Sequence, residues 1–188
     1  MAQPRVVLPG DPAPWFTQRS SSNPRYRLET AAGRFLLLCF FGSAADAQSA
    51  AALEAAYARP DLFDDEDAAF FGVSMDPEDE AGRISPRIPG FRLFWDQDGA
   101  IGKLYGALAA DYKPGGGGVT MHRRWVLIDP ALRVVAVVPF APDRSDIGAI
   151  IDITQAAITQ ARSRREAQPA PVLMLPRVLE PELCQELI

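Results

Sequence analysis

Cysteine and histidine are scarce in this chain of 188 residues. The two cysteines, Cys39 and Cys184, lie far apart in dissimilar surroundings, so the pattern does not indicate a disulfide framework. A single histidine, His122, cannot by itself build a histidine-rich zinc site or a two-histidine, one-carboxylate iron site. A Ser–His hydrolytic arrangement would have to use that same histidine, and no G-x-S-x-G turn is present to position a serine.

Long apolar runs and excess positive charge are also missing. No stretch approaches the roughly 20 apolar residues of a membrane helix, and the N-terminal sequence MAQPRVVLPGDP lacks the apolar core of a secretory signal. The net charge of −5 argues against a general nucleic-acid binder, which would normally present a basic face. With so few cysteines, these absences predict a cytoplasmic protein that binds neither nucleic acid nor a membrane.

The remaining composition is that of a folded protein, with 48% hydrophobic and 23% charged residues. Apolar segments alternate with helical ones, which predicts an α/β fold with a mixed sheet. The expected strands cover 35–41, 69–74, 124–128 and 134–140, and the expected helices cover 47–58, 101–108 and 146–162. The apolar segment 91–95, which contains Arg92, is left without an assigned element.

The first expected strand runs directly into the first expected helix. The sequence FLLLCFF is apolar on both faces, as in a central strand covered by helices, and Gly42 ends it. Ser43 to Asp46 fits a helix capping box, with Asp46 as part of the cap. Further on, the charge run 78–80 is interpreted as a solvated turn.

Cys39 lies inside that central strand. We interpret it as a small buried hydrophobic residue with a raised pKa, because buried apolar thiols are unreactive. The competing interpretation, a reactive thiol, needs an exposure that a central strand does not offer. Cys184 is expected to pack one face of a helix near the end of the chain.

The C-terminal part of the sequence changes character. Residues 162–171 are polar and rich in arginine, proline and alanine, which is typical of a linker. Residues 172–188 then read as a strand, a turn and a helix opening at Pro181. We therefore expect one domain over 1–161, a linker over 162–171 and the truncated start of a second domain over 172–188.

Five motifs, in order and at the right spacing, carry a resemblance to a known family. They are GDPAPWF, FLLLCFFGS, FFGVSMDPEDEA, LFWDQDGAIGKLYGA and RRWVLIDP. Together they make roughly the first 160 residues resemble the peroxiredoxins, the alkyl hydroperoxide reductase/thiol-specific antioxidant (AhpC/TSA) branch of the thioredoxin superfamily. The resemblance implies a thioredoxin-like fold with a mixed central sheet flanked by helices.

The resemblance also implies a reactive site, and this chain departs from it. The family pattern P-x-x-x-T-x-x-C falls on Gly42, Asp46 and Ser49, so a serine occupies the position of the peroxidatic cysteine. Such chemistry needs a thiolate at a helix start, and a serine there does not ionise usefully without an adjacent base. The family arginine that stabilises the thiolate is retained as Arg123. A carboxylate at Asp46 would raise the pKa of a neighbouring thiol by like-charge repulsion.

The resemblance therefore implies a vestigial pocket formed by Gly42, Ser43, Asp46, Ser49 and Arg123. Two interpretations of its residues stay open. Ser49 is either a helix-surface serine or a donor to a small oxyanion, and Arg123 either lines the pocket or forms a salt bridge with Asp46.

The segment 172–188 resembles the start of a prolyl-4-hydroxylase-type 2-oxoglutarate/Fe(II) oxygenase domain. The first hypothesis is thus a catalytically degenerate peroxiredoxin-like domain that serves as an accessory module of its own C-terminal oxygenase domain. The Fe(II) and 2-oxoglutarate would belong to that downstream domain, and no cofactor is expected in this chain. Peroxiredoxin-like surfaces also make a homodimer plausible. The alternatives are an active thiol peroxidase that uses Cys39 and a sensor whose pocket binds a small molecule without turnover.

Overall fold

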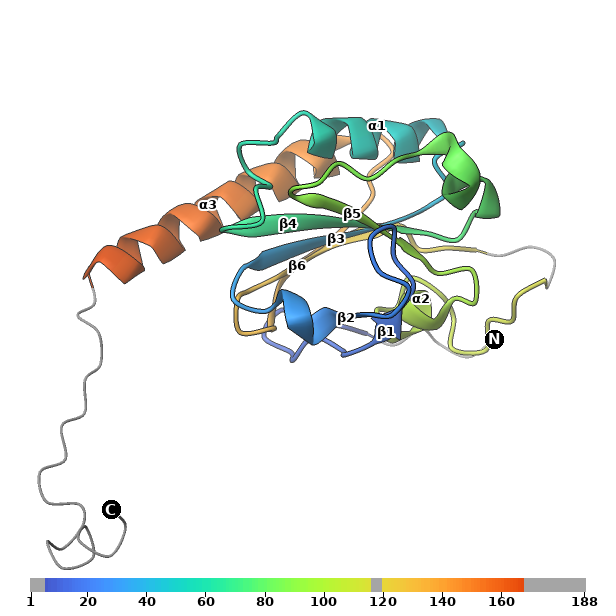
Figure 1. Cartoon of the computed structure of the whole chain (residues 1–188), viewed down its shortest axis with the longest axis horizontal. Coiled ribbons are helices and arrows are strands. Elements are labelled where there is room, and N and C mark those ends of the chain that lie inside the picture. Colours follow the sequence, from blue (N-terminus) through green and yellow to red (C-terminus); the bar gives the residue numbers. More distant parts are fainter. Residues whose placement is uncertain (1–5, 116–119, 168–188) are drawn as a thin grey trace, which may run out of the picture.

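A five-stranded mixed sheet forms the centre of the computed structural model, which describes residues 6–115 and 120–167 (Figure 1). The strands are β3 (Phe35–Gly42), β4 (Ala68–Ser74), β5 (Phe91–Trp95), β6 (Arg124–Ile128) and β7 (Val134–Pro139). Their order across the sheet is β5-β4-β3-β6-β7, with β3, β4 and β5 parallel and β6 antiparallel to both β3 and β7. This arrangement confirms the predicted α/β class and its mixed sheet.

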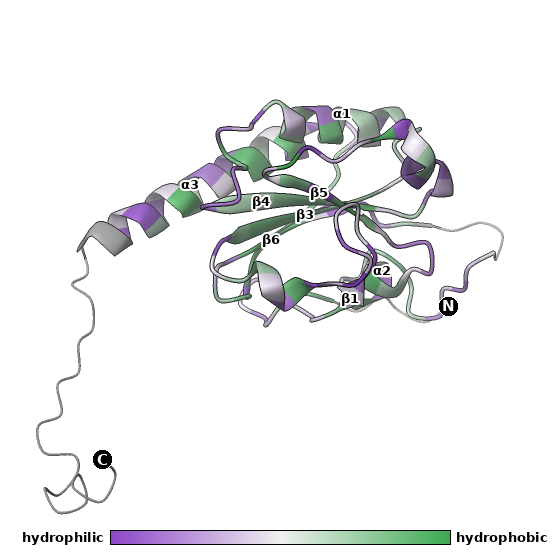
Figure 2. Cartoon of the chain, in the orientation of Figure 1, coloured by the Kyte–Doolittle hydropathy of each residue, from purple (hydrophilic) through white to green (hydrophobic). Residues whose placement is uncertain are grey.

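Strand β3 is buried on both faces because its side chains alternate between two cores. Leu36, Leu38 and Phe40 belong to one hydrophobic cluster, whereas Leu37 and Cys39 belong to the other. Figure 2 shows the hydrophobic residues concentrated on the central strands, between the more polar outer layers. An apolar run without alternation is what a central parallel strand requires when both faces are covered.

Two layers cover the sheet. Helices α1 (Ala47–Tyr57) and α3 (Ser145–Ala167) lie on one face, where Leu53 and Ile150 enter the core (Figure 1). The other face is covered by β1 (Thr17–Gln18), β2 (Tyr26–Arg27), the short helical turn η1 (Leu28–Ala31) and α2 (Ala100–Leu104). The remaining element, η2 (Asp79–Arg83), follows β4 in the chain.

The apolar segment to which the sequence assigns no element is an edge strand. Residues Phe91–Trp95 form β5, which pairs in parallel with β4. Arg92 interrupts its apolar pattern, but the structure neutralises this charge with an ion pair of 2.6 Å to Asp65. An edge strand tolerates such a charged side chain and is protected by it from pairing with other chains.

Helix α3 is longer than expected. It continues through Arg162 to Ala167 and extends past the end of the sheet in Figure 1, so the predicted linker begins inside this helix. The rest of that linker and the predicted second domain at 172–188 lie outside the described residues. No helix in the described part of the chain is long and apolar enough to cross a membrane. The cytoplasmic location stays a prediction.

Candidate functional site

Gly42 ends β3 in a backbone conformation that proline cannot adopt. Its φ angle is +84°, whereas the proline ring holds φ near about −65°. A Cβ atom added at this position would lie 2.8 Å from the Sδ atom of Met121. The glycine at the position of the family's proline is therefore required by the local backbone of this chain.

Asp46 caps helix α1. Its Oδ1 accepts hydrogen bonds from the backbone N–H groups of Gln48 and Ser49, both at 3.0 Å. The hydrogen bond from the Ser49 N–H, together with the nearby Arg123 guanidinium, holds the pKa of the Asp46 carboxyl below its usual value. The predicted capping role of Asp46 is confirmed, but the predicted capping box over 43–46 is wrong, because Asp46 is itself the N-cap residue and Ser43 lies before it.

Arg123 is brought to the same place by the sheet. It directly precedes β6, and the antiparallel register that pairs Phe40 with Arg124 sets this end of β6 beside the end of β3. The Nη1 of Arg123 forms an ion pair with the Oδ1 of Asp46. Of the two interpretations left open for Arg123, the salt bridge with Asp46 is therefore present in the structure.

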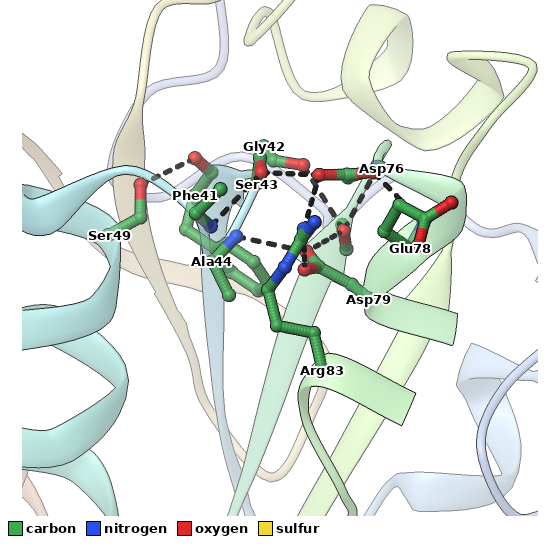
Figure 3. Close-up of polar contacts among 11 residues, drawn as sticks. Phe41, Gly42, Ser43, Ala44, Ser49, Asp76, Glu78, Asp79 and Arg83 are labelled. Carbon is green, nitrogen blue, oxygen red and sulfur yellow. Dashed lines mark hydrogen bonds and ion pairs between the residues drawn. The ribbon is translucent and has the colours of Figure 1, made fainter. Parts of the chain in front are cut away.

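Ser49 is fully buried, so the prediction of a helix-surface serine is wrong. It lies in the first turn of α1, which faces the sheet at this point, and its Oγ donates to the carbonyl oxygen of Phe41 at 2.9 Å. The Nη1 of Arg123 donates to the same Oγ at 3.3 Å. Figure 3 shows the Ser49 side chain pointing at the Phe41 carbonyl, apart from the other polar residues drawn.

A second group of polar side chains fixes the turn between β3 and α1; we call it the loop cluster. It consists of Ser43, Ser74, Asp76, Asp79 and Arg83 (Figure 3). Ser43 donates to Asp76 at 2.6 Å, and this hydrogen bond lowers the pKa of the Asp76 carboxyl, as does the ion pair with Arg83. The cluster therefore ties the turn after β3 to the turn after β4.

Asp79 is the centre of the loop cluster and has no exposed surface. Its two carboxylate oxygens accept from the Ser74 hydroxyl at 2.6 Å, the Ala44 N–H at 3.0 Å and the Arg83 guanidinium at 2.7 Å. A buried carboxylate is tolerated when it is paired and hydrogen-bonded in this way. The prediction that residues 78–80 form a solvated turn is thus wrong for Asp79.

The described residues bring all five predicted site residues to one end of the sheet, but in two separate groups. Asp46, Ser49 and Arg123 contact one another, whereas Ser43 joins the loop cluster and Gly42 supplies backbone only. Sequence reasoning missed the other four members of the loop cluster. The sequence did contain one signal for an ion pair in this cluster, because Asp79 and Arg83 are four residues apart, the spacing of one helical turn.

Cys39 is fully buried in the middle of β3, between Gly72 of β4 and Trp125 of β6. Burial raises the pKa of its thiol well above the usual value, and the negative charge of Asp146 acts in the same direction. The expected buried cysteine is confirmed, and the exposure that a reactive Cys39 needs is missing. Cys184 lies outside the described residues.

The described residues contain no group of three histidine, cysteine, aspartate or glutamate side chains that could hold a metal ion. Solvent reaches Asp46 and Arg123, whose side chains are 49% and 30% exposed, but not Ser49. The site therefore consists of the Asp46–Arg123 ion pair at the start of α1 and, beneath it, the Ser49 hydroxyl, which already has hydrogen-bond partners.

Solved structures of peroxiredoxins have the same fold. A peroxiredoxin Q from Xanthomonas campestris is 19% identical, with a TM-score of 0.58 over 76% of this chain and 91% of that one. A cysteine-to-serine variant of PrxQ from Xylella fastidiosa is 18% identical, with a TM-score of 0.62 over 81% and 98%. Peroxidoxin BcpB from Mycobacterium tuberculosis is 19% identical, with a TM-score of 0.61 over 82% and 97%. At these identities the likeness shows the fold alone, which is thioredoxin-like as predicted.

A search of curated proteins found no match. A scan against family models matched residues 9–137 to the AhpC/TSA family, and it gave no support to an oxygenase domain at 172–188. The match covers well over half of the chain and includes β3, α1, β4, β5 and β6. The chain therefore belongs to the AhpC/TSA family.

Proposed function

We propose that this AhpC/TSA-family chain does not reduce peroxides through a thiol and serves instead as a non-catalytic binding domain. The observation that carries the proposal is the state of Ser49. This residue stands where the family resemblance places the reactive cysteine, and its buried hydroxyl donates to the Phe41 carbonyl. Arg123, which would stabilise a thiolate there, is already paired with Asp46.

The chemistry of the pocket supports the proposal. A serine hydroxyl becomes a nucleophile only when an adjacent base takes its proton. The nearest carboxylate oxygen, Oδ1 of Asp46, lies 3.3 Å from the Ser49 Oγ. The lowered pKa of Asp46 makes it a weak base, and the shorter hydrogen bond of the hydroxyl, 2.9 Å, goes to the Phe41 carbonyl oxygen. Ser49 is therefore suited to holding α1 against β3.

The other described candidate for the chemistry is Cys39, which is enclosed by the sheet. A thiol reacts as its thiolate, and burial raises the pKa of Cys39 well above its usual value. Cys39 also lies in the hydrophobic cluster that contains buried residues of α1 and α3, and a peroxide molecule would have to penetrate that cluster to reach it. Both arguments disfavour the alternative function, a thiol peroxidase that uses Cys39.

We further propose, from the resemblance of residues 172–188, that the domain acts as an accessory module of a C-terminal 2-oxoglutarate/Fe(II) oxygenase domain. That domain would hold the Fe(II) and the 2-oxoglutarate. A homodimer is compatible with the outer edge of β7, since unpaired strand edges are templates for pairing. Among the described residues, 10–13 cover the beginning of this edge, through the contacts of Gly10 and Asp11 with Val134.

A peroxide-consumption assay tests the central proposal. The purified chain is mixed with hydrogen peroxide and dithiothreitol as the electron donor, and it is compared with Cys39→Ala and Cys184→Ala. We expect all three proteins to match the rate of dithiothreitol alone. Peroxide consumption that either alanine substitution abolishes, in a variant with unchanged circular dichroism, would overturn the proposal. Ser49→Ala is the matched control, because it removes the hydroxyl without touching either thiol.

A further inference from the structure

A pocket of about 510 Å³ lies beside the Asp46–Arg123 ion pair. Arg123 and Arg124 contribute its charged side chains, and Gln48 of α1 lies at its margin, where its amide donates to the Ala141 carbonyl at 2.6 Å. Much of the remaining wall is apolar and comes from Met121, Pro139, Phe140 and Pro142. The pocket shares Arg123 with the vestigial site, but neither Asp46 nor Ser49 lines it.

Arg124 is the unusual residue in this pocket. It is partly buried at the start of β6, between Phe40 of β3 and Pro139 of β7. Its Nε donates to the carbonyl oxygen of His122 at 3.1 Å. Among the described side chains, in residues 6–115 and 120–164, no carboxylate forms an ion pair with its guanidinium. Burial alone lowers the pKa of Arg124, yet an arginine keeps its charge in proteins.

Other partly buried arginines of this chain form ion pairs with a carboxylate. Arg34 and Arg92 share the carboxylate of Asp65. A partly buried charge without a counter-charge loses hydration and gains no Coulombic attraction in return. The fold thus neutralises these guanidinium groups and leaves the one at Arg124 open to the pocket.

The charges around the pocket define what would fit there. Asp46 neutralises Arg123, so Arg124 supplies one uncompensated positive charge. A guanidinium presents parallel N–H donors that match the two oxygens of a carboxylate. A phosphate dianion would bring a second negative charge, and His122 is the one further basic residue among the described residues that line the pocket. The apolar wall favours a ligand with a hydrophobic body.

We propose that this pocket binds a small monocarboxylate with an apolar body, whose carboxylate is held by Arg124 and whose body packs against Phe140 and Met121. This proposal rests on the proposed function, because it names the class of ligand that the proposed binding domain would take. Arg124 has no part in the argument against peroxide reduction, however. A binding measurement and the peroxide assay can therefore fail independently of each other.

Isothermal titration calorimetry on the full chain tests the inference with three probes. Phenylacetate carries both the carboxylate and an apolar body, acetate carries the carboxylate alone, and inorganic phosphate carries the wrong charge. We expect saturable binding of phenylacetate, with acetate and phosphate at least roughly tenfold weaker, because burying an aromatic group contributes more than that factor.

Variants assign the binding to the pocket. Arg124→Gln should weaken phenylacetate at least roughly tenfold, the effect of losing a charge-assisted bidentate contact, and Arg124→Lys should recover only part of it. Arg25→Gln, at an exposed arginine in the turn before β2, removes the same charge elsewhere and should leave binding unchanged. Phe140→Ala should weaken phenylacetate and leave the weak acetate signal as it was.

Three results would overturn the inference. They are the absence of saturable phenylacetate binding, equal binding by the wild type and a folded Arg124→Gln variant, and phosphate binding as tight as that of phenylacetate. Thermal unfolding of each variant shows whether it is folded. A variant that unfolds is replaced by Arg124→Lys, for which unchanged affinity also contradicts the inference.

Discussion

Replacing Asp46 by alanine tests the geometry at the start of α1. The substitution removes the cap that accepts from the Gln48 and Ser49 N–H groups, and it leaves Arg123 without its partner. Loss of an aspartate cap costs typically about 1 kcal/mol. The ion pair is partly exposed and contributes about 0.2–1 kcal/mol. We therefore expect Asp46→Ala to lower the free energy of unfolding by about 1–2 kcal/mol.

Asp46→Asn separates the two contributions. Asparagine is as good a cap as aspartate, so this variant loses only the ion pair and should cost at most about 1 kcal/mol. Urea unfolding followed by circular dichroism measures both variants, with an unchanged m-value as the sign that only stability has changed. If Asp46→Asn destabilises the chain as much as Asp46→Ala does, the cap adds nothing to the stability beyond the ion pair. If neither variant is destabilised, the reasoning about this site is wrong.

Three further predictions concern the surroundings of the site. Burial raises the pKa of Asp96 from 3.8 to about 6. The stabilisation that Asp96 contributes is therefore fully present below the pKa of the unfolded state and is lost as the pH rises through about 6, which lowers the free energy of unfolding by about 3 kcal/mol in all. In urea titrations between pH 4 and 7, Asp96→Asn should remove this pH dependence. An identical pH profile in the variant would count against the prediction. Asp79→Ala should destabilise the chain by about 2–4 kcal/mol, since it leaves the buried Ser74 hydroxyl without its carboxylate acceptor and removes the buried centre of the loop cluster. A loss below about 0.5 kcal/mol in urea unfolding, the range of ordinary surface substitutions, would show that the loop cluster is not a structural tie. In the double variant Asp46→Thr/Ser49→Cys, the introduced thiol should have a lower pKa than in Ser49→Cys alone, because Asp46→Thr removes a negative charge and releases Arg123. The rate of iodoacetamide alkylation as a function of pH measures the thiol pKa in each variant. Equal pKa values would refute the electrostatic argument.

Much of the fold could be predicted because apolar runs and turn residues mark its central elements. The strand at 35–41 and the helix from residue 47 agree with β3 and α1 to within a residue or so. β5 could not be predicted because Arg92 breaks the apolar pattern, and the ion pair with Asp65 that makes this acceptable joins residues far apart in the sequence. The end of α3 lies beyond its predicted position because a helix that extends past the sheet has no apolar face to mark its length.

The ion pair at the start of α1 could be predicted from the sequence, whereas the burial of Ser49 and the loop cluster could not. The cap by Asp46 and its ion pair with Arg123 follow from local capping rules and charge complementarity. The burial of Ser49 could not be predicted, because α1 is rich in alanine and its sequence does not distinguish a buried face. The position of Asp79 in an acidic run is typical of a solvated residue, and only the tertiary contacts with Ala44 and Ser74 show otherwise.

The described part of this chain offers no thiol to a peroxide. The most direct measurement treats the folded chain with equimolar hydrogen peroxide and a sulfenic-acid trapping reagent, and then maps the trapped residues by mass spectrometry. We predict that Cys39 stays unmodified in the folded chain and is trapped once urea exposes it. Trapping of Cys39 in the folded chain, at a rate similar to that in urea, would contradict the account.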